Sequence, residues 1–384
     1  MKICIYCSRD NVSGETSLEH CIPQFLGGAY APLRFKTRCC CERCNSLLGL
    51  FVDGAFARTW WINSWMCFVA HAAYDPQNPS GIPLLCMGKC DLTPHDMTAD
   101  EVCESWLGPG GEQVYWIRPH AERFGWYVGG DPIAAKRVET RAYFYFGPGS
   151  LAAPRKSLLS FRDAFAGLRV KKVMCTQVQG LDVLEIGFSP PDELDERRID
   201  YFNRHCTGDT TSRVISVPYK MDFDFRFCAK LALAVGFAVF GEEYLHTGYA
   251  AELRKALWFR GTGEPPGIRG VAALQADADP IFKNNTGRPH LVSIVVMRVT
   301  SGLAMVLNLG QQHVWKLLVS PDTDGLNSSA MDWVGAGRLI ILSASLEAGL
   351  EMTWHEFMGH SNGRRPHGGL SVLEARLHGA APSG

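Results

Sequence analysis

Two pairs of cysteines, each with two residues between them, constrain the start of this chain more than any other feature. The pairs are Cys4 with Cys7 and Cys41 with Cys44, and residues 8–40 separate them. Thiolates are preferred zinc ligands, and two such turns from distant segments can close one tetrahedral site. A segment of about sixty residues with long loops buries too little surface to fold firmly alone. We therefore expect these four cysteines to bind a structural Zn²⁺ ion.

The second pair needs a choice of register, because Cys39 and Cys40 directly precede Cys41. Only Cys41 leaves two residues before Cys44. Buried free thiols are the alternative to a metal site. The chain has 14 cysteines in 384 residues and begins without an export-signal pattern, which favours reduced thiols and a metal site over a disulfide scaffold. We do not expect Cys21, Cys39 or Cys40 to be ligands.

Polar residues with chemical potential lie between and just after the cysteine pairs. Glu19 and His20 are adjacent, Asn45 directly follows Cys44, and Asp53 comes eight residues later. Adjacent side chains on an extended strand point to opposite faces. The unperturbed pKa of histidine, about 6.5, suits proton abstraction at neutral pH. Carboxylate oxygens suit a hard ion such as Mg²⁺ or Mn²⁺, and an α-helical rotation keeps Asp53 on the side of Asn45.

In order and spacing, C-x2-C, E-H-x-x-P, G-G, C-x2-C-N and a helical acid resemble the HNH endonuclease family, in its ββα-metal (treble-clef) branch. The resemblance covers about residues 3–56 and implies hydrolysis of phosphodiester bonds. It implies that His20 is the general base and that Asn45 orients its imidazole. It further implies that Glu19 and Asp53 bind a catalytic Mg²⁺ or Mn²⁺, although many members carry Asp at the first position and His or Asn at the last.

The length predicts two or three domains, and residues 75–83, with three prolines, form the expected linker. We expect an α+β fold: an HNH module over residues 1–75, followed by a mixed α+β region over residues 84–384 for substrate recognition or regulation. This region has antiparallel strands, a long buried helix and a subdomain boundary near residues 200–220.

Local patterns predict the elements in more detail. A helix from residue 42 to about 74, with a bend at Gly54, closes the module. Further helices are expected at 222–240 and 249–259, and an irregular tail beyond 363. His355 and His360 resemble a metalloprotease helix, but they are five residues apart and cannot share one helical face. Strands are expected at 114–117, 125–128, 141–146, 181–186, 291–297, 303–307 and 314–319.

The formal net charge of −1 gives no global attraction for a polyanion, so nucleic acid must be held by a local patch, for which Arg34, Lys36, Arg38 and Arg43 are candidates. No segment is apolar enough for a membrane span, and we expect a cytoplasmic protein. The leading function is a metal-dependent endonuclease that acts on DNA in preference to RNA, in restriction or anti-phage defence.

Two other classes stay open. One is a nuclease whose C-terminal half senses a nucleotide second messenger and drives formation of a homo-oligomer. The other is a non-catalytic, zinc-dependent nucleic-acid-binding protein, against which the retention of Glu19, His20, Asn45 and Asp53 argues.

Overall fold

The chain is divided into two compact units. The computed structural model describes residues 2–11, 16–75, 77, 81–94, 96–147, 149, 154–176, 183–206, 214–217, 220–264, 266–271, 280–322, 326 and 328–377. One unit combines Met1–Ala57 with Lys220–Gly384, and the other is Arg58–Tyr219. The second unit is thus inserted between two parts of the first. This division differs from the expected break at residues 75–83, because the chain returns at residue 220 to pack against its own N-terminal module.

The N-terminal module has the expected ββα arrangement. Its hairpin pairs β3 with β4 in antiparallel register, with Glu19 opposite Thr37 and His20 opposite Lys36. Helix α1 follows β4 directly, and the side chain of Cys41 accepts a hydrogen bond from the backbone N–H of Cys44 at the helix N-terminus. The second cysteine turn therefore coincides with the start of the helix. The elements are β1 (Lys2–Ile3), β2 (Asp10–Asn11), β3 (Thr16–His20), η1 (Gln24–Leu26), η2 (Gly28–Tyr30), η3 (Leu33–Phe35), β4 (Lys36–Cys41) and α1 (Glu42–Leu48).

The prediction of one helix from residue 42 to about 74 was wrong. Instead, α1 continues into a π-helical turn, and two further helices follow this turn. Thr59 is extended and separates the two later helices from each other. Gly49 begins the π-helical turn and Gly54 directly follows it, and glycine weakens an α-helix at such positions. A π-helical turn inserts an extra residue and so changes the direction of the side chains after it. The segments are η4 (Gly49–Asp53), α2 (Gly54–Ala57) and α3 (Trp60–Ala72).

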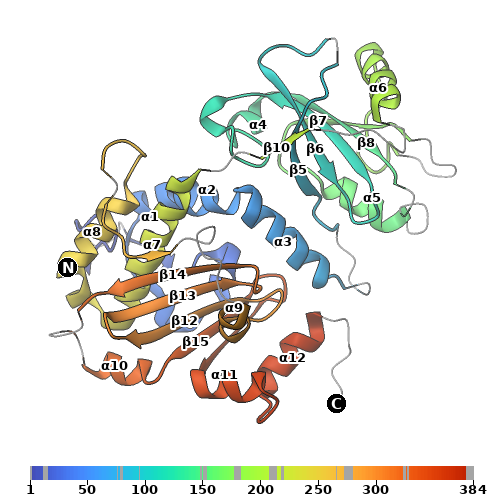
Figure 1. The fold of residues 1–384 in the computed structure, drawn as a ribbon. Coiled ribbons are helices and arrows are strands. Elements are labelled where there is room, and N and C mark those ends of the chain that lie inside the picture. Colours follow the sequence, from blue (N-terminus) through green and yellow to red (C-terminus); the bar gives the residue numbers. More distant parts are fainter. Residues whose placement is uncertain are drawn as a thin grey trace. The chain divides into compact units, whose positions relative to one another are not determined.

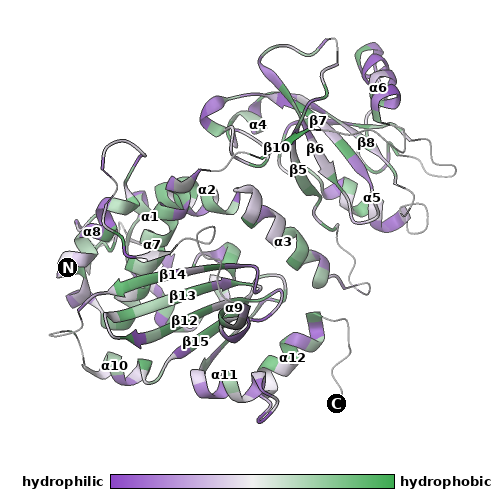
Figure 2. Cartoon of the chain, viewed as in Figure 1, coloured by the Kyte–Doolittle hydropathy of each residue, from purple (hydrophilic) through white to green (hydrophobic). Residues whose placement is uncertain are grey.

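A six-stranded antiparallel sheet forms the centre of the first unit (Figure 1). Its strand order is β11-β14-β13-β12-β15-β16, and the expected meander is its β12-β13-β14 part. In Figure 2, β13 and β14 are coloured mainly as hydrophobic residues. The strands are β11 (Gly270–Val271), β12 (Val292–Val299), β13 (Gly302–Leu309), β14 (His313–Ser320), β15 (Arg338–Ser343) and β16 (Ala348–Thr353).

The long expected helix, α7, joins this sheet to the N-terminal module. Phe227 of α7 stacks on Phe56 with 3.8 Å between ring centroids, and Phe56 meets the edge of Trp315 of β14 at 5.4 Å. Each such aromatic pair contributes about 0.5–1.5 kcal/mol beyond its buried area. The module and the C-terminal segment therefore share one core. The segments that lead from this core are α7 (Met221–Phe240), η6 (Glu242–His246) and α8 (Gly248–Leu257).

Part of the segment expected to be irregular is helical. Residues 368–377 form a helix, because Leu370, Leu373 and Leu377 recur at helical spacing and are buried. His360 Nε2 lies 3.0 Å from Glu374 Oε2 of that helix, so this histidine serves helix packing. None of the helices in the described ranges is both long and apolar enough to cross a membrane. The helices around the sheet are α9 (Pro280–Thr286), α10 (Ser328–Val334), α11 (Trp354–Ser361) and α12 (Gly368–Leu377).

The inserted unit is built on a second six-stranded sheet, of order β10-β5-β6-β7-β8-β9, in which only the β8–β9 pair is parallel. Its two faces carry separate cores: Phe161 of α5 packs on one and Phe202 of α6 on the other. The strands are β5 (Leu85–Cys90), β6 (Glu101–Leu107), β7 (Gln113–Pro119), β8 (Thr140–Tyr145), β9 (Val170–Met174) and β10 (Ile215–Ser216). The helices are α3, η5 (Glu122–Phe124), α4 (Ala134–Arg137), α5 (Pro154–Asp163) and α6 (Glu193–Cys206).

Two strand predictions in this unit did not hold. Residues 125–128 form turns after η5, since Gly129 and Gly130 both take positive φ there. Residues 183–186 also lie in turns, while Leu181 and Asp182 fall outside the described residues. The strand expected at 114–117 is confirmed as part of β7, and the one expected at 141–146 is confirmed up to Tyr145, where β8 ends.

The glycine pair of the module gives a first prediction. A Cβ at Gly28 would lie 1.7 Å from the carbonyl oxygen of Ile22, whereas nothing lies within 4 Å of a Cβ at Gly49. We expect Gly28→Ala to lower the free energy of unfolding by about 1–3 kcal/mol, because backbone has to move. Gly49→Ala, the control, should be neutral or stabilising by up to about 1 kcal/mol. Denaturant unfolding measures both, and equal stabilities would contradict the described turn.

Candidate active site

The four paired cysteines converge at one point, and their sulfur atoms all lie within 4.8 Å of one another. Cys4 and Cys44 are buried, and Cys7 and Cys41 are half-buried. This cluster fits a structural zinc site, as the two C-x2-C pairs predicted. Cys21 lies outside the cluster, and burial raises the pKa of its thiol to about 12, which keeps it protonated.

Glu19 and Asp53 also come together, but around a lysine. Lys230 Nζ of α7 lies 3.0 Å from Glu19 Oε1 and 2.6 Å from Asp53 Oδ2. The side chains of Lys230 and Glu19 are each 3% exposed, and that of Asp53 is 16% exposed. The Tyr6 hydroxyl donates a further hydrogen bond to Glu19 Oε1, at 2.7 Å. We call Glu19, Asp53 and Lys230 the ion triad.

The charge of Lys230 is favoured in this setting. Burial alone lowers the pKa of its ammonium group, but the carboxylates of Asp53 and Glu19 raise it by more, so the net shift is upward. The ring of Tyr6 lies 5.6 Å from the same nitrogen and adds a weak cation–π contact. The ammonium is thus protonated and fixed by its surroundings.

This arrangement does not fit a divalent ion at Glu19 and Asp53. Mg²⁺ requires oxygen ligands at about 2.0–2.1 Å in octahedral geometry, and it usually keeps several waters. Here both carboxylates already contact one ammonium group, and Glu19 is nearly inaccessible. The expected catalytic Mg²⁺ or Mn²⁺ therefore has no place at these two residues beside Lys230.

His20 follows Glu19 on β3, and strand alternation directs its side chain to the opposite face. It is half-buried, and its Nδ1 is 3.4 Å from Gln24 Nε2. Burial lowers the pKa of His20, the charge of Lys36 lowers it further, and the charge of Glu19 partly opposes both. The imidazole is therefore neutral at neutral pH and able to accept a proton.

Asn45 secures the strand that carries His20. Its Nδ2 donates to Ser17 Oγ at 2.9 Å and to the carbonyl oxygen of Leu18 at 3.2 Å. Asn45 thus forms hydrogen bonds from α1 to β3, two residues before His20. Its expected role in orienting the imidazole stays a prediction. Its contribution to the geometry is to fix the backbone of the hairpin.

Sequence reasoning missed Lys230 and Tyr6. A signal for Lys230 was present, because it is the one charged residue of the stretch Phe227–Phe240. A lysine within a buried helix needs a charged partner. Which carboxylates supply that partner depends on the packing of α7 against β3 and η4, which local patterns do not specify.

The described site is a cysteine-clamped ββα module that presents one neutral histidine on its hairpin. Residues 4–61 match the family model of the HNH endonucleases, and these residues form an HNH module. The comparisons with curated proteins and with solved structures find no match. The family match includes every site residue proposed from the sequence, but it does not reach Lys230.

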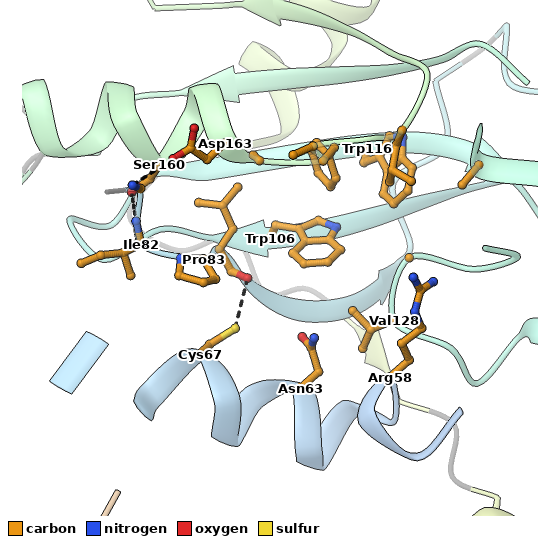
Figure 3. Close-up of a pocket in the computed structure, with 18 residues that line it drawn as sticks. Arg58, Asn63, Cys67, Ile82, Pro83, Trp106, Trp116, Val128, Ser160 and Asp163 are labelled. Atoms are coloured by element: carbon orange, nitrogen blue, oxygen red, sulfur yellow. Dashed lines mark hydrogen bonds between the residues drawn. The ribbon is translucent and has the colours of Figure 1, made fainter. Parts of the chain in front are cut away.

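The inserted unit contains a cavity of about 400 Å³ (Figure 3). Trp106 and Trp116 line it from the sheet, with ring centroids 6.4 Å apart, and Arg58 and Asn63 line it from the opposite side. The Oδ1 atom of Asn63 is buried without a hydrogen-bond partner. A cavity of this size, with aromatic walls and a few polar groups, is suited to a small molecule.

The register of the second cysteine pair can be tested by exchange for serine. Cys41→Ser should reduce the zinc content to near zero and lower the stability by several kcal/mol, because structural zinc contributes on the order of 10 kcal/mol to such modules. Cys39→Ser, two residues earlier on the same strand, should keep its zinc. Elemental analysis and thermal unfolding report both effects. Zinc loss in Cys39→Ser alone would show that the ligand set is wrong.

Proposed function

We propose that this protein is an HNH endonuclease that hydrolyses phosphodiester bonds of nucleic acid, with His20 as the general base. The placement of His20 carries the proposal, because a neutral imidazole is held on a zinc-clamped hairpin on the face opposite to the buried ion triad. The family match over residues 4–61 supports the reaction class. On the family resemblance, we expect DNA in preference to RNA as the substrate, and restriction or anti-phage defence as the setting.

The proposed reaction needs a general base for the attacking water, positive charge near the phosphate and a proton for the leaving oxygen. His20 takes a proton from water as the water oxygen attacks phosphorus, and the P–O bond to the leaving oxygen breaks. The leaving oxygen is protonated from solvent. Arg38 and Arg43 are exposed on the module and can hold backbone phosphates. Arg34, by contrast, stacks over Trp333 at 4.5 Å, and Lys36 Nζ donates to the carbonyl oxygen of Ala29.

Removal of the imidazole is the direct test. His20→Ala should lower the rate of supercoiled-plasmid cleavage by about 10²–10⁴-fold, the usual contribution of general-base catalysis, with unchanged zinc content. His355→Ala is the matched control, since His355 is an exposed histidine of α11 and should leave the rate unchanged. The assay is run separately with Mg²⁺, with Mn²⁺ and with EDTA on the zinc-loaded protein. Equal cleavage by wild type and His20→Ala would exclude His20 as the base.

A second candidate function is gating of the nuclease by a small nucleotide, and the cavity of the inserted unit favours it. Arg58 can pair with a phosphate, and the indole faces of Trp106 and Trp116 can contact a base. The cavity is lined by residues between Arg58 and Leu168, in the inserted unit.

Calorimetry with a panel of mononucleotides and cyclic nucleotides tests this second candidate. Asn63→Asp places a negative charge in the cavity and should weaken binding at least about tenfold, equivalent to 1.4 kcal/mol. Binding that is insensitive to this change, or no binding of any nucleotide, would argue against gating through this cavity.

A further inference from the structure

Lys230 is a charged residue at a buried position, where removing its ammonium group from water is unfavourable. It lies in the middle of α7, where three of the four residues one helical turn away, Phe227, Leu233 and Ala234, are fully buried, while Arg226 is half-buried. An unpaired ammonium group there would be strongly unfavourable. Its ion pairs with Glu19 and Asp53 remove that penalty.

The two carboxylates meet this ammonium from opposite parts of the module. Glu19 extends from the hairpin strand β3, and Asp53 ends the π-helical turn η4. In the family resemblance, these are the two positions that hold the catalytic metal. The structure places a nitrogen cation from residue 230 where both carboxylates converge.

A divalent ion and this ammonium cannot share the carboxylates. An ion bound at about 2.1 Å from the same oxygens would lie within a few ångströms of a second positive charge in a poorly solvated site. Retreat of the lysine is also blocked, because its side chain is 3% exposed and α7 packs it among apolar neighbours.

We propose that Lys230 is the resident cation of the Glu19–Asp53 pair and excludes divalent metal from it. Lys230 thereby acts as a positioning residue: it holds β3, and with it His20, against α7 by a permanent charge instead of an exchangeable ion. The inference rests on the proposed function only in identifying Glu19 and Asp53 as the metal position of an HNH module.

Binding of Mn²⁺ to the full-length, zinc-loaded protein tests this, with electron paramagnetic resonance of free Mn²⁺ as the readout. We expect that wild type and Asp53→Asn show the same Mn²⁺ binding, so that none of it depends on this pair. Lys230→Met keeps the length of the side chain but removes its charge. It should gain one Mn²⁺ per chain, with a Kd at least about tenfold lower than any wild-type site.

The vacated pair also gives a stability readout. Lys230→Met leaves two largely buried carboxylates without a counter-charge, so its melting temperature should fall and then rise again with Mn²⁺, because ligand binding stabilises the folded state. The wild-type melting temperature should not respond in this way. Lys255→Met is the matched control, since Lys255 pairs with Glu252 at 2.6 Å on the surface with 67% of its side chain exposed. It should gain no Mn²⁺ site.

Two outcomes would overturn the proposal. The first is a wild-type Mn²⁺ site that Asp53→Asn abolishes, a comparison that decides the matter even where Lys230→Met fails to fold. The second is a folded Lys230→Met variant whose Mn²⁺ binding does not depend on Asp53. This would be seen as no gained Mn²⁺ site, or as a gained site that persists when Asp53→Asn is added. Both readouts are independent of cleavage, so an inactive nuclease would contradict the proposed function without affecting this result.

Discussion

The ion triad is the interaction on which the first unit depends. It joins three elements that are far apart in sequence, and all three charges are mostly or fully removed from water. Loss of one partner from such a buried pair typically costs about 3–5 kcal/mol, because the remaining charge is left unpaired. The triad therefore ties the position of α7 to that of β3 and η4. Without residues 220–240, Glu19 and Asp53 would lose both their counter-charge and the helix that packs against η4.

The cysteine cluster and the ion triad hold different parts of the hairpin. The cysteines fix the chain turn before β2 and the junction of β4 with α1. The triad fixes the far end of β3, next to His20, and Asn45 fixes its middle through Ser17 and Leu18. Arg254 and Trp258 of the C-terminal segment add hydrogen bonds to the carbonyl oxygens of Ile5 and Tyr6, beside the first cysteine pair. The histidine is thus held by contacts from both parts of the unit.

Local sequence signals predicted the parts of the fold that local chemistry determines. The cysteine spacing located the four-cysteine cluster, and the alternation expected for β3 fits its burial, with Glu19 buried and His20 half-buried. The apolar run of α7 and the meander of β12 to β14 were also predicted from local patterns. Asp53 was placed by assuming α-helical rotation, which the π-helical turn at Gly49 to Asp53 invalidates. The partners of Lys230 and the return of the chain at residue 220 could not be predicted, because they arise from long-range packing that leaves no local period.

The insertion of residues 58–219 also sets an order in time during synthesis. Lys230 follows Asp53 by 177 residues. At translation rates of about 5–20 residues per second, the lysine emerges roughly 9–35 seconds after the acid it pairs with. The four paired cysteines are all made by residue 44, so their cluster can form on the ribosome well before α7 exists. During that interval Glu19 and Asp53 of the nascent module have no Lys230 to pair with. Their ion pairs can form only when more than half of the chain has been made.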